Sequence, residues 1–142
     1  FKVTKDSIVH EVFFDFKNKF DIHFEPNEVK YDTLVLDVPR AINMQTIWPH
    51  THNIAKNVLC FAKTPTNEII PLVRIPNWDY LWQSSYEFVK PISIPAHSKI
   101  YMICLYDNTE NNKRNPNHPP QKVIYGRKAQ DEMLVLMYSY FL

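Results

Sequence analysis

The sequence is short of glycine, which occurs once in 142 residues, whereas proline occurs eleven times. Long helices tolerate few prolines, because proline lacks a backbone donor and clashes with the preceding turn. Short strands accept proline at their ends, at bulges and at sheet edges. The ratio of these two residues therefore favours a β protein over a helical one.

Other features are also absent. The formal net charge is only +1 and basic residues do not cluster, which argues against a nucleic-acid-binding surface. No apolar run reaches the roughly 18 residues of a membrane span, and we recognise no signal peptide. Because the chain starts at Phe1, we expect a processed protein or a domain excised from a longer one.

Cysteine is scarce, and two cysteines do not make a disulfide framework. Cys60 and Cys104 each lie in an apolar run, where a buried, unreactive thiol is the commonest outcome. A Cys60–Cys104 bridge is the alternative. Neither free thiols nor a disulfide would identify the redox compartment of the protein.

Apolar residues, in contrast, are plentiful. They make up 45% of the chain and aromatic residues 14%, which excludes disordered and fibrous classes. A chain of 142 residues suits one core, so residues 1–142 are predicted to form a single domain.

Short β-branched and aromatic segments separated by turn signals predict a succession of strands. The predicted strands are Ser7–Lys17, Phe20–Phe24, Asp32–Val38, Gln45–His52, Val58–Ala62, Ile69–Ile75, Tyr86–Ile94, Lys99–Tyr106, Val123–Arg127 and Met133–Leu142. Pro49 places its strand at a sheet edge or a bulge, and Thr64–Asn67 predicts a hairpin turn. A helix is the alternative for Asp131–Leu142, but its Val, Tyr and Phe residues favour a strand. The pattern predicts an all-β sandwich or jelly roll with little helix.

One long segment, Asp107–Gln121, is too polar and proline-rich for regular structure. Loops of this length are usually functional or mobile. We expect its His118 to be solvated rather than a ligand. His10, His23 and His97 have no partner pattern, and we expect them to be structural or exposed.

His50 and His52 form a His-x-His pattern, and on a strand both side chains lie on one face. Zinc, copper, iron and nickel all accept imidazole. Alone, the pattern is more typical of polar residues on a solvated face. Met133 would usually fill a core, but thioether sulfur is a soft ligand that favours Cu(I). Two imidazoles and one thioether would make a copper site that can cycle between Cu(I) and Cu(II).

The segment Trp48-Pro49-His50-Thr51-His52, followed 81 residues after His52 by the Met133 of Asp131-Glu132-Met133, resembles one family. It is the second copper domain of the type II, ascorbate-dependent monooxygenases, which include peptidylglycine α-hydroxylating monooxygenase and dopamine β-monooxygenase. Bacterial relatives look closer still. They are similar at Trp78-Asp79-Tyr80-Leu81-Trp82-Gln83, Tyr86, Tyr106-Asp107-Asn108, Asn115-Pro116 and Gly126, so the match runs from about Trp48 to Tyr140.

The resemblance implies a jelly-roll-type β-sandwich whose copper is held by His50, His52 and Met133. In the family this centre activates oxygen for C–H hydroxylation, with electrons that ascorbate supplies through a second copper in a preceding domain. Residues 1–47 contain only His10 and His23, so an electron-donating partner with a second copper or a cytochrome is implied. An extracytoplasmic location, periplasmic or secreted, is implied as well.

Three positions depart from the animal peptide-hydroxylating enzyme. Trp48 stands where that enzyme has arginine, and Met137 where it has tyrosine, so neither residue can anchor a peptide carboxylate. Together with Val135, these residues predict an apolar substrate pocket and an apolar or aromatic small-molecule substrate. Leu134 stands where the relative has a cysteine bridged to the counterpart of Cys104, so Cys104 lacks that partner.

Two further functions stay open from the sequence. One is a copper-binding module without turnover, serving electron transfer, storage or sensing. The other is a β-sandwich interaction domain whose metal site has decayed.

Overall fold

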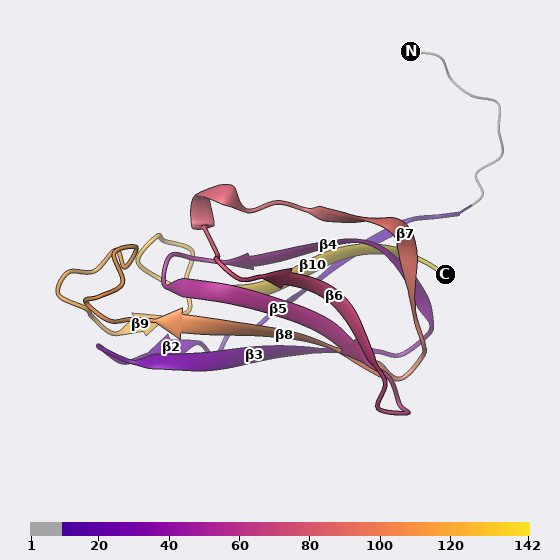
Figure 1. The fold of residues 1–142 in the computed structure, drawn as a ribbon, viewed down its shortest axis with the longest axis horizontal. Helices are drawn as coiled ribbons and strands as arrows, with labels where there is room; N and C mark the ends of the chain where they lie inside the picture. The colour runs from indigo at the N-terminus through magenta and orange to yellow at the C-terminus, as the bar shows by residue number, and fades with distance from the viewer. Residues whose placement is uncertain (1–9) are drawn as a thin grey trace, which may run out of the picture.

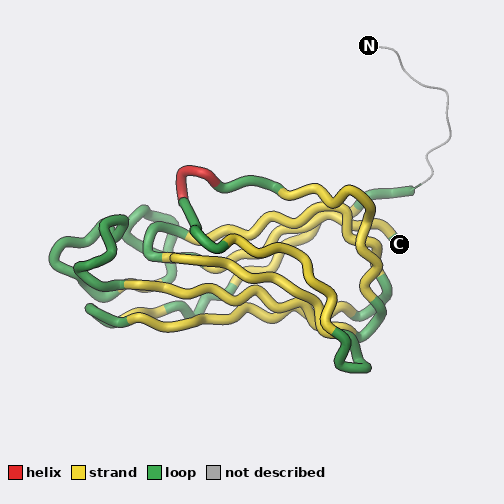
Figure 2. The backbone as a smooth tube through the Cα atoms, viewed as in Figure 1, coloured by secondary structure: helices red, strands yellow, loops and turns green. Residues whose placement is uncertain are grey.

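The computed structural model describes residues 10–142, and regular structure there is β apart from one 3-10 turn. The strands are β1 (Phe13–Asn18), β2 (His23–Phe24), β3 (Val29–Val38), β4 (Ile42–Thr51), β5 (Ala55–Lys63), β6 (Ile69–Ile75), β7 (Tyr86–Ile94), β8 (Ser98–Asp107), β9 (Val123–Ile124) and β10 (Leu134–Phe141). The 3-10 turn η1 (Tyr80–Trp82) connects β6 to β7 and is the red segment in Figure 2.

Two four-stranded antiparallel sheets form the body of the molecule (Figure 1). One has the order β1-β10-β4-β7 and the other β3-β8-β5-β6, while β2 and β9 form a small separate ladder. Buried residues from both large sheets make one core, including Met44, Ile47, Ile100, Met102 and Leu136. The expected all-β sandwich is therefore confirmed.

Strand β8 shows how the sequence specifies this arrangement. Ile100, Met102, Cys104 and Tyr106 are completely buried, whereas the residues between them are half-buried on the opposite face. Such alternation is the signature of a strand with one face in the core. Pairing with β3 on one side and β5 on the other makes β8 a central strand.

The hairpin predicted at Thr64–Asn67 joins β5 to β6, and the tail forms β10, as the strand interpretation required. Pro49 was expected at an edge or a bulge. Strand β4 is in fact interior, between β10 and β7, but its pairing with β7 ends at Ile47, so Pro49 lies beyond that ladder. The bulge lies between Met44 and Thr46.

Four predicted strands need shorter bounds. Phe20–Phe24 shrinks to the two residues of β2, and Met133–Leu142 shrinks to Leu134–Phe141. Of Ser7–Lys17, residues 7–9 lie outside the described part, and the strand begins only at Phe13. Val123–Arg127 shrinks to the two residues of β9, after which Tyr125 forms a single bridge with Glu132. The following residues, to Asp131, form a loop whose Asp131 carbonyl reaches His52 at the end of β4.

Cys60 and Cys104 are buried, unbridged thiols, as the apolar context predicted. Cys104 pairs with Val58, and Cys60 pairs with Met102, so the two cysteines are diagonal neighbours on adjacent strands. Diagonal positions lie about 7–8 Å apart, beyond the reach of a disulfide. Burial raises the pKa of both thiols, which keeps them protonated and unreactive.

The Asp107–Gln121 segment contains no strand or helix, as expected. Buried asparagines hold it in place: Asn115 donates to Asn108, Asn108 donates to the Gln121 carbonyl, and Asn112 donates to the Asp107 carbonyl. In the described part of the chain, no helix is long and apolar enough to cross a membrane.

Candidate metal centre

The two histidines of the His-x-His pattern lie side by side where β4 ends. His50 is the last residue but one of β4, and His52 follows the strand directly. Their ring centroids are 5.2 Å apart, with the rings nearly perpendicular. His52 is buried and His50 half-buried. The predicted strand Gln45–His52 thus ends one residue early, at Thr51, and the two imidazoles of the pattern still lie together.

Hydrogen bonds determine which nitrogen of each ring carries the proton. His52 Nδ1 lies 3.0 Å from the Asp131 carbonyl oxygen, which can only accept, so Nδ1 is protonated. His50 Nδ1 lies 2.5 Å from Gln83 Oε1. Because Gln83 Nε2 donates to the Tyr80 carbonyl, Oε1 is the atom that faces His50. Both rings therefore keep an unprotonated Nε2 for a metal, in the tautomer that such outer hydrogen bonds select.

The electrostatics also favour a neutral His52. Burial lowers the pKa of His52, and the adjacent His50 lowers it further, while the bond to the Asp131 carbonyl opposes the shift. A neutral imidazole is the form that binds metals.

The segment around η1 covers the histidine pair. The Tyr80 ring lies 5.4 Å from the His52 ring and 6.5 Å from the His50 ring, centroid to centroid. The Asp79 carboxylate begins the turn by accepting from the Leu81 amide. Trp78 is buried and donates its indole N–H to the His52 carbonyl at 3.0 Å. Tyr80 and Gln83 are therefore placed over the histidines by contacts at both sides.

Arg114, from the long loop, fastens the same segment. Its guanidinium donates to the Trp78 carbonyl and forms an ion pair with Asp79 at 3.1 Å. The polar Asp107–Gln121 loop thus has a positioning role, although its own His118 is exposed and takes no part in the pair.

Met133 lies beside His52. It precedes β10, whose first residue, Leu134, pairs with Thr51, the last residue of β4. The amides of His52 and Met133 both donate to one carboxylate oxygen of Glu132. Since a single atom accepts from both, the two backbone nitrogens are close neighbours. Sequence reasoning placed these donors 81 residues apart, and the fold brings their backbones together.

Glu132 is completely buried beneath this junction. Its Oε1 accepts from Thr51 Oγ1 at 2.8 Å as well as from the two amides. Tyr106, also fully buried, donates to the Met133 carbonyl, and its hydroxyl oxygen lies 3.0 Å from Thr51 Oγ1. Burial raises the pKa of Glu132 to about 7 against the hydrogen bonds from Met133, His52 and Thr51, which lower it.

The single glycine explains how the Asp131 carbonyl reaches His52. A Cβ on Gly126 would overlap the Asp131 carboxylate, which accepts from the Lys128 amide within the same loop. Only glycine permits this close approach. Asn53 further ties the loop down by donating to the Ala129 carbonyl.

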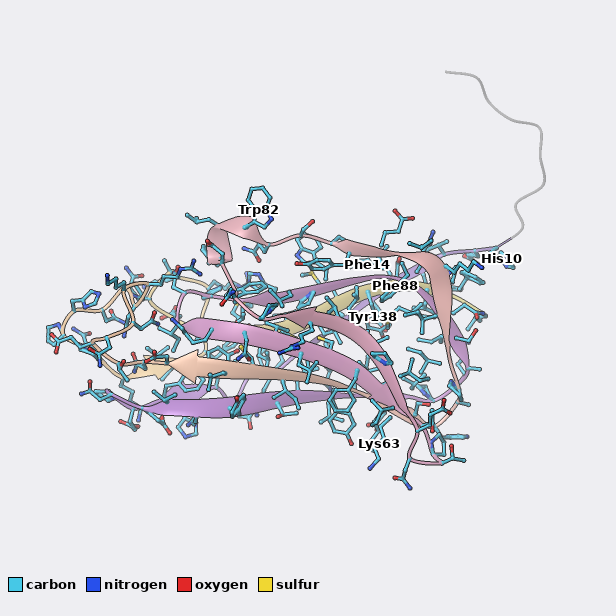
Figure 3. All side chains as sticks on the ribbon, in the orientation of Figure 1. His10, Phe14, Lys63, Trp82, Phe88 and Tyr138 are labelled. Carbon is cyan, nitrogen blue, oxygen red and sulfur yellow. The ribbon has the colours of Figure 1, made fainter. Side chains whose placement is uncertain are left out.

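The three substrate-pocket candidates lie on the outer face of the β1-β10-β4-β7 sheet. Val135 pairs with His50 and Met137 with Trp48, and paired residues point to the same side. Phe16 of β1 pairs with Met137 on the other side of β10, and it is 62% exposed. Trp48, Met137 and Phe16 make an open apolar surface beside His50, whereas Val135, which pairs with His50, is buried. Trp82 of η1, 82% exposed, points away from the body of the sandwich (Figure 3).

The other described histidines, His10, His23, His97 and His118, are all exposed, in agreement with the expectation for them. Within residues 10–142, no group of three or more His, Cys, Asp or Glu side chains is arranged to hold a metal. A metal here would therefore depend on the histidine pair plus a different donor, and Met133 is the candidate that the sequence indicated.

Sequence reasoning missed three residues of this arrangement. Gln83 and Tyr80 lie in a segment that we singled out only for its resemblance, and no pattern connects them with His50. Glu132 was named as part of the Asp131-Glu132-Met133 motif, without a role of its own. Its one available signal was a carboxylate next to a strand otherwise made of apolar and aromatic residues.

Comparisons with known proteins add no identification: no protein-family model matches the chain, and no curated protein matches it.

Proposed function

We propose that this chain is a copper-binding domain that works as the oxygen-activating half of a monooxygenase-type oxidoreductase. The observation that carries the proposal is the pair of neighbouring imidazoles whose Nδ1 atoms both contact a hydrogen-bond acceptor, which leaves Nε2 as the unprotonated nitrogen of each neutral ring. The Glu132 oxygen that accepts from both His52 and Met133 supports Met133 as the third donor.

The donor set suits copper. His50 and His52 would supply imidazole, and Met133 a thioether, which is a soft donor that favours Cu(I) over harder divalent ions. Copper held in this way supplies one-electron chemistry with O₂. The chain's own residues orient the rings through Gln83 and the Asp131 carbonyl and exclude water from the inner side of His52.

The strand order adds support at the level of the fold. Numbered in chain order, the eight strands of the two large sheets run 1-8-3-6 and 2-7-4-5. Two four-stranded sheets connected in this way support the jelly-roll topology that the resemblance implies.

The substrate in this proposal is an apolar or aromatic small molecule. The three pocket candidates offer neither a charge nor a hydroxyl group to a peptide carboxylate. They are Val135, which pairs with His50, and the next pair along the sheet, Trp48 and Met137. The open sheet face also leaves room for an electron-donating partner, a second copper or cytochrome domain. An extracytoplasmic location, where ascorbate or another donor acts, belongs to the same proposal.

A copper-binding module without turnover is the second candidate. It is favoured by the exposure and separation of every other described histidine, which leave one candidate copper centre among residues 10–142. Hydroxylation of a C–H bond by O₂ requires more electrons than one Cu(I) centre supplies, so this chain needs a donor.

The first experiment measures Cu(I) binding by anaerobic competition with a chromogenic chelator. The wild-type chain should bind one equivalent, and Met133→Ile should weaken Cu(I) more than Cu(II). Binding no stronger than that of a His50→Ala/His52→Ala double variant would refute the copper proposal.

The second experiment measures ascorbate-driven oxygen uptake by the copper-loaded chain with a glycine-extended peptide. We expect copper binding without efficient hydroxylation. Multiple coupled turnovers that Met133→Ile abolishes would refute both the apolar-substrate inference and the need for a partner.

A further inference from the structure

Glu132 occupies a position that its chemistry makes costly. The side chain is completely buried, and its Oε2 has no hydrogen-bond partner among the described residues. An unpartnered buried carboxylate oxygen loses its hydration without compensation. An apolar side chain here would avoid the desolvation cost of Oε2, although it would leave the donors to Oε1 unpaired. A need of the core alone therefore explains the carboxylate poorly.

The contacts of the other oxygen are specific. Oε1 accepts from the His52 amide, from the Met133 amide at 2.8 Å and from the Thr51 hydroxyl at 2.8 Å. Two of these three donors belong to the backbone of candidate copper ligands. One comes from the exit of β4 and the other from the entrance to β10.

The strand ladder does not make this connection by itself. Pairing between β4 and β10 ends at Thr51 and Leu134, one residue short of His52 and Met133 on each strand. Beyond the ladder, the two chains diverge into separate loops: residues 52–54 lead to β5, and the preceding loop carries Asp131. Beyond the last ladder pair, the Glu132 carboxylate connects the two chains by accepting hydrogen bonds from the amides of His52 and Met133.

We propose that Glu132 is a positioning residue of the metal centre, whose buried carboxylate holds the backbones of His52 and Met133 together and so sets the separation of their two donor atoms. This inference rests on the proposed function, in which both residues bind copper. Glu132 touches neither metal nor substrate, and it acts through the amides of the ligands. Tyr106 assists by holding the Met133 carbonyl.

Three substitutions separate geometry from charge. Glu132→Gln keeps an acceptor oxygen at the same place and removes the charge. Glu132→Asp keeps the charge but withdraws both oxygens by about one C–C bond length, roughly 1.5 Å. Glu132→Leu removes both properties. The control is Ile100→Ala, which makes a cavity in the same core near the opposite end of β8 from Tyr106.

The first readout is Cu(I) affinity of the full chain, with the metal alone as probe. The Asp and Leu variants should bind at least tenfold more weakly, within the 10–100-fold range of lost outer-sphere contacts. The Gln variant and the Ile100→Ala control should stay within threefold of wild type. X-ray absorption should show the sulfur donor in the Gln variant and its loss in the Asp variant.

An equal loss of Cu(I) affinity in the Gln and Leu variants would overturn the inference, because charge would then matter rather than position. Wild-type affinity in Asp would overturn it as well.

The second readout uses the metal-free protein, so that it survives a failure of the copper proposal. NMR should show a slowly exchanging Nδ1–H on His52 and proximity of its ring to the Met133 methyl group in wild type, Gln and Ile100→Ala. Both signals should be lost in Asp. If Leu fails to fold, the contrast between Asp and Gln decides the question. Unchanged signals in a folded Asp variant would refute the positioning role, whether or not wild type binds copper.

Discussion

Gln83 provides the sharpest test of how the metal centre is held, because it is far from His50 in sequence yet bonded to it. Gln83→Leu keeps the approximate volume but removes the acceptor for His50 Nδ1 and the donor to the Tyr80 carbonyl. His50 then loses the contact that selects its tautomer and ring orientation. Loss of an outer-sphere partner typically costs 10–100-fold in metal affinity. We therefore expect the Cu(I) dissociation constant to rise by about that factor, or roughly 1.4–2.7 kcal/mol.

The fold should also lose stability. Gln83 is only half-buried, and each net hydrogen bond contributes about 0.5–1.5 kcal/mol, so loss of its two bonds should lower the free energy of unfolding by about 1–3 kcal/mol. The assay combines chelator competition under anaerobic conditions with urea unfolding. Gln83→Glu keeps an acceptor for His50 and should bind copper within about threefold of wild type, whereas Gln121→Leu, in an exposed loop position, should change neither quantity. A Gln83→Leu variant with wild-type copper affinity would show that Gln83 does not orient His50.

Three further predictions concern the supports of the centre. Gly126→Ala should destabilise the chain by about 1–3 kcal/mol, because the new Cβ overlaps the Asp131 carboxylate; thermal unfolding measures this, and an unchanged midpoint would contradict it. Arg114→Met removes the contacts to the Trp78 carbonyl and Asp79, so the η1 segment should open more often and proteolysis next to Trp82 should accelerate. Equal cleavage rates for the variant and wild type would show that Arg114 does not hold this segment. Thiol titration without reductant should find two thiols after denaturation and almost none within minutes in the native protein, because both cysteines are buried; a denatured count of zero would indicate a bridge and contradict the structure.

The fold class could be read from the sequence because its signals are local. The alternation of Ile100, Met102, Cys104 and Tyr106 with less buried residues specifies a strand with one core face wherever the strand pairs. The turn at Thr64–Asn67 specifies a hairpin for the same reason, since its geometry depends on neighbouring residues alone. Proline had a less certain meaning. Pro49 lies in an interior strand, because the neighbouring strand β7 ends its pairing before reaching it.

The histidine pair was visible in the sequence because its two residues are only two positions apart, at the end of one strand. The rest of the centre depends on strand order. His52 and Met133 become neighbours because β4 and β10 are adjacent in the sheet, and nothing local to either segment encodes that adjacency. Sequence reasoning assigned Glu132 no role of its own, and only the tertiary structure makes it a buried acceptor for Thr51.

By itself, the sequence determined the strands, the buried thiols and the paired imidazoles, because each follows from residue type and spacing over a few positions. Only the tertiary structure decided which ring nitrogens are free. That choice belongs to the Gln83 side chain and the Asp131 carbonyl, which reach the rings from 33 and 79 residues away. Hydrogen-bond partners at such separations are selected by topology and loop closure, and the free energy of those contacts is realised only when the whole sandwich has formed.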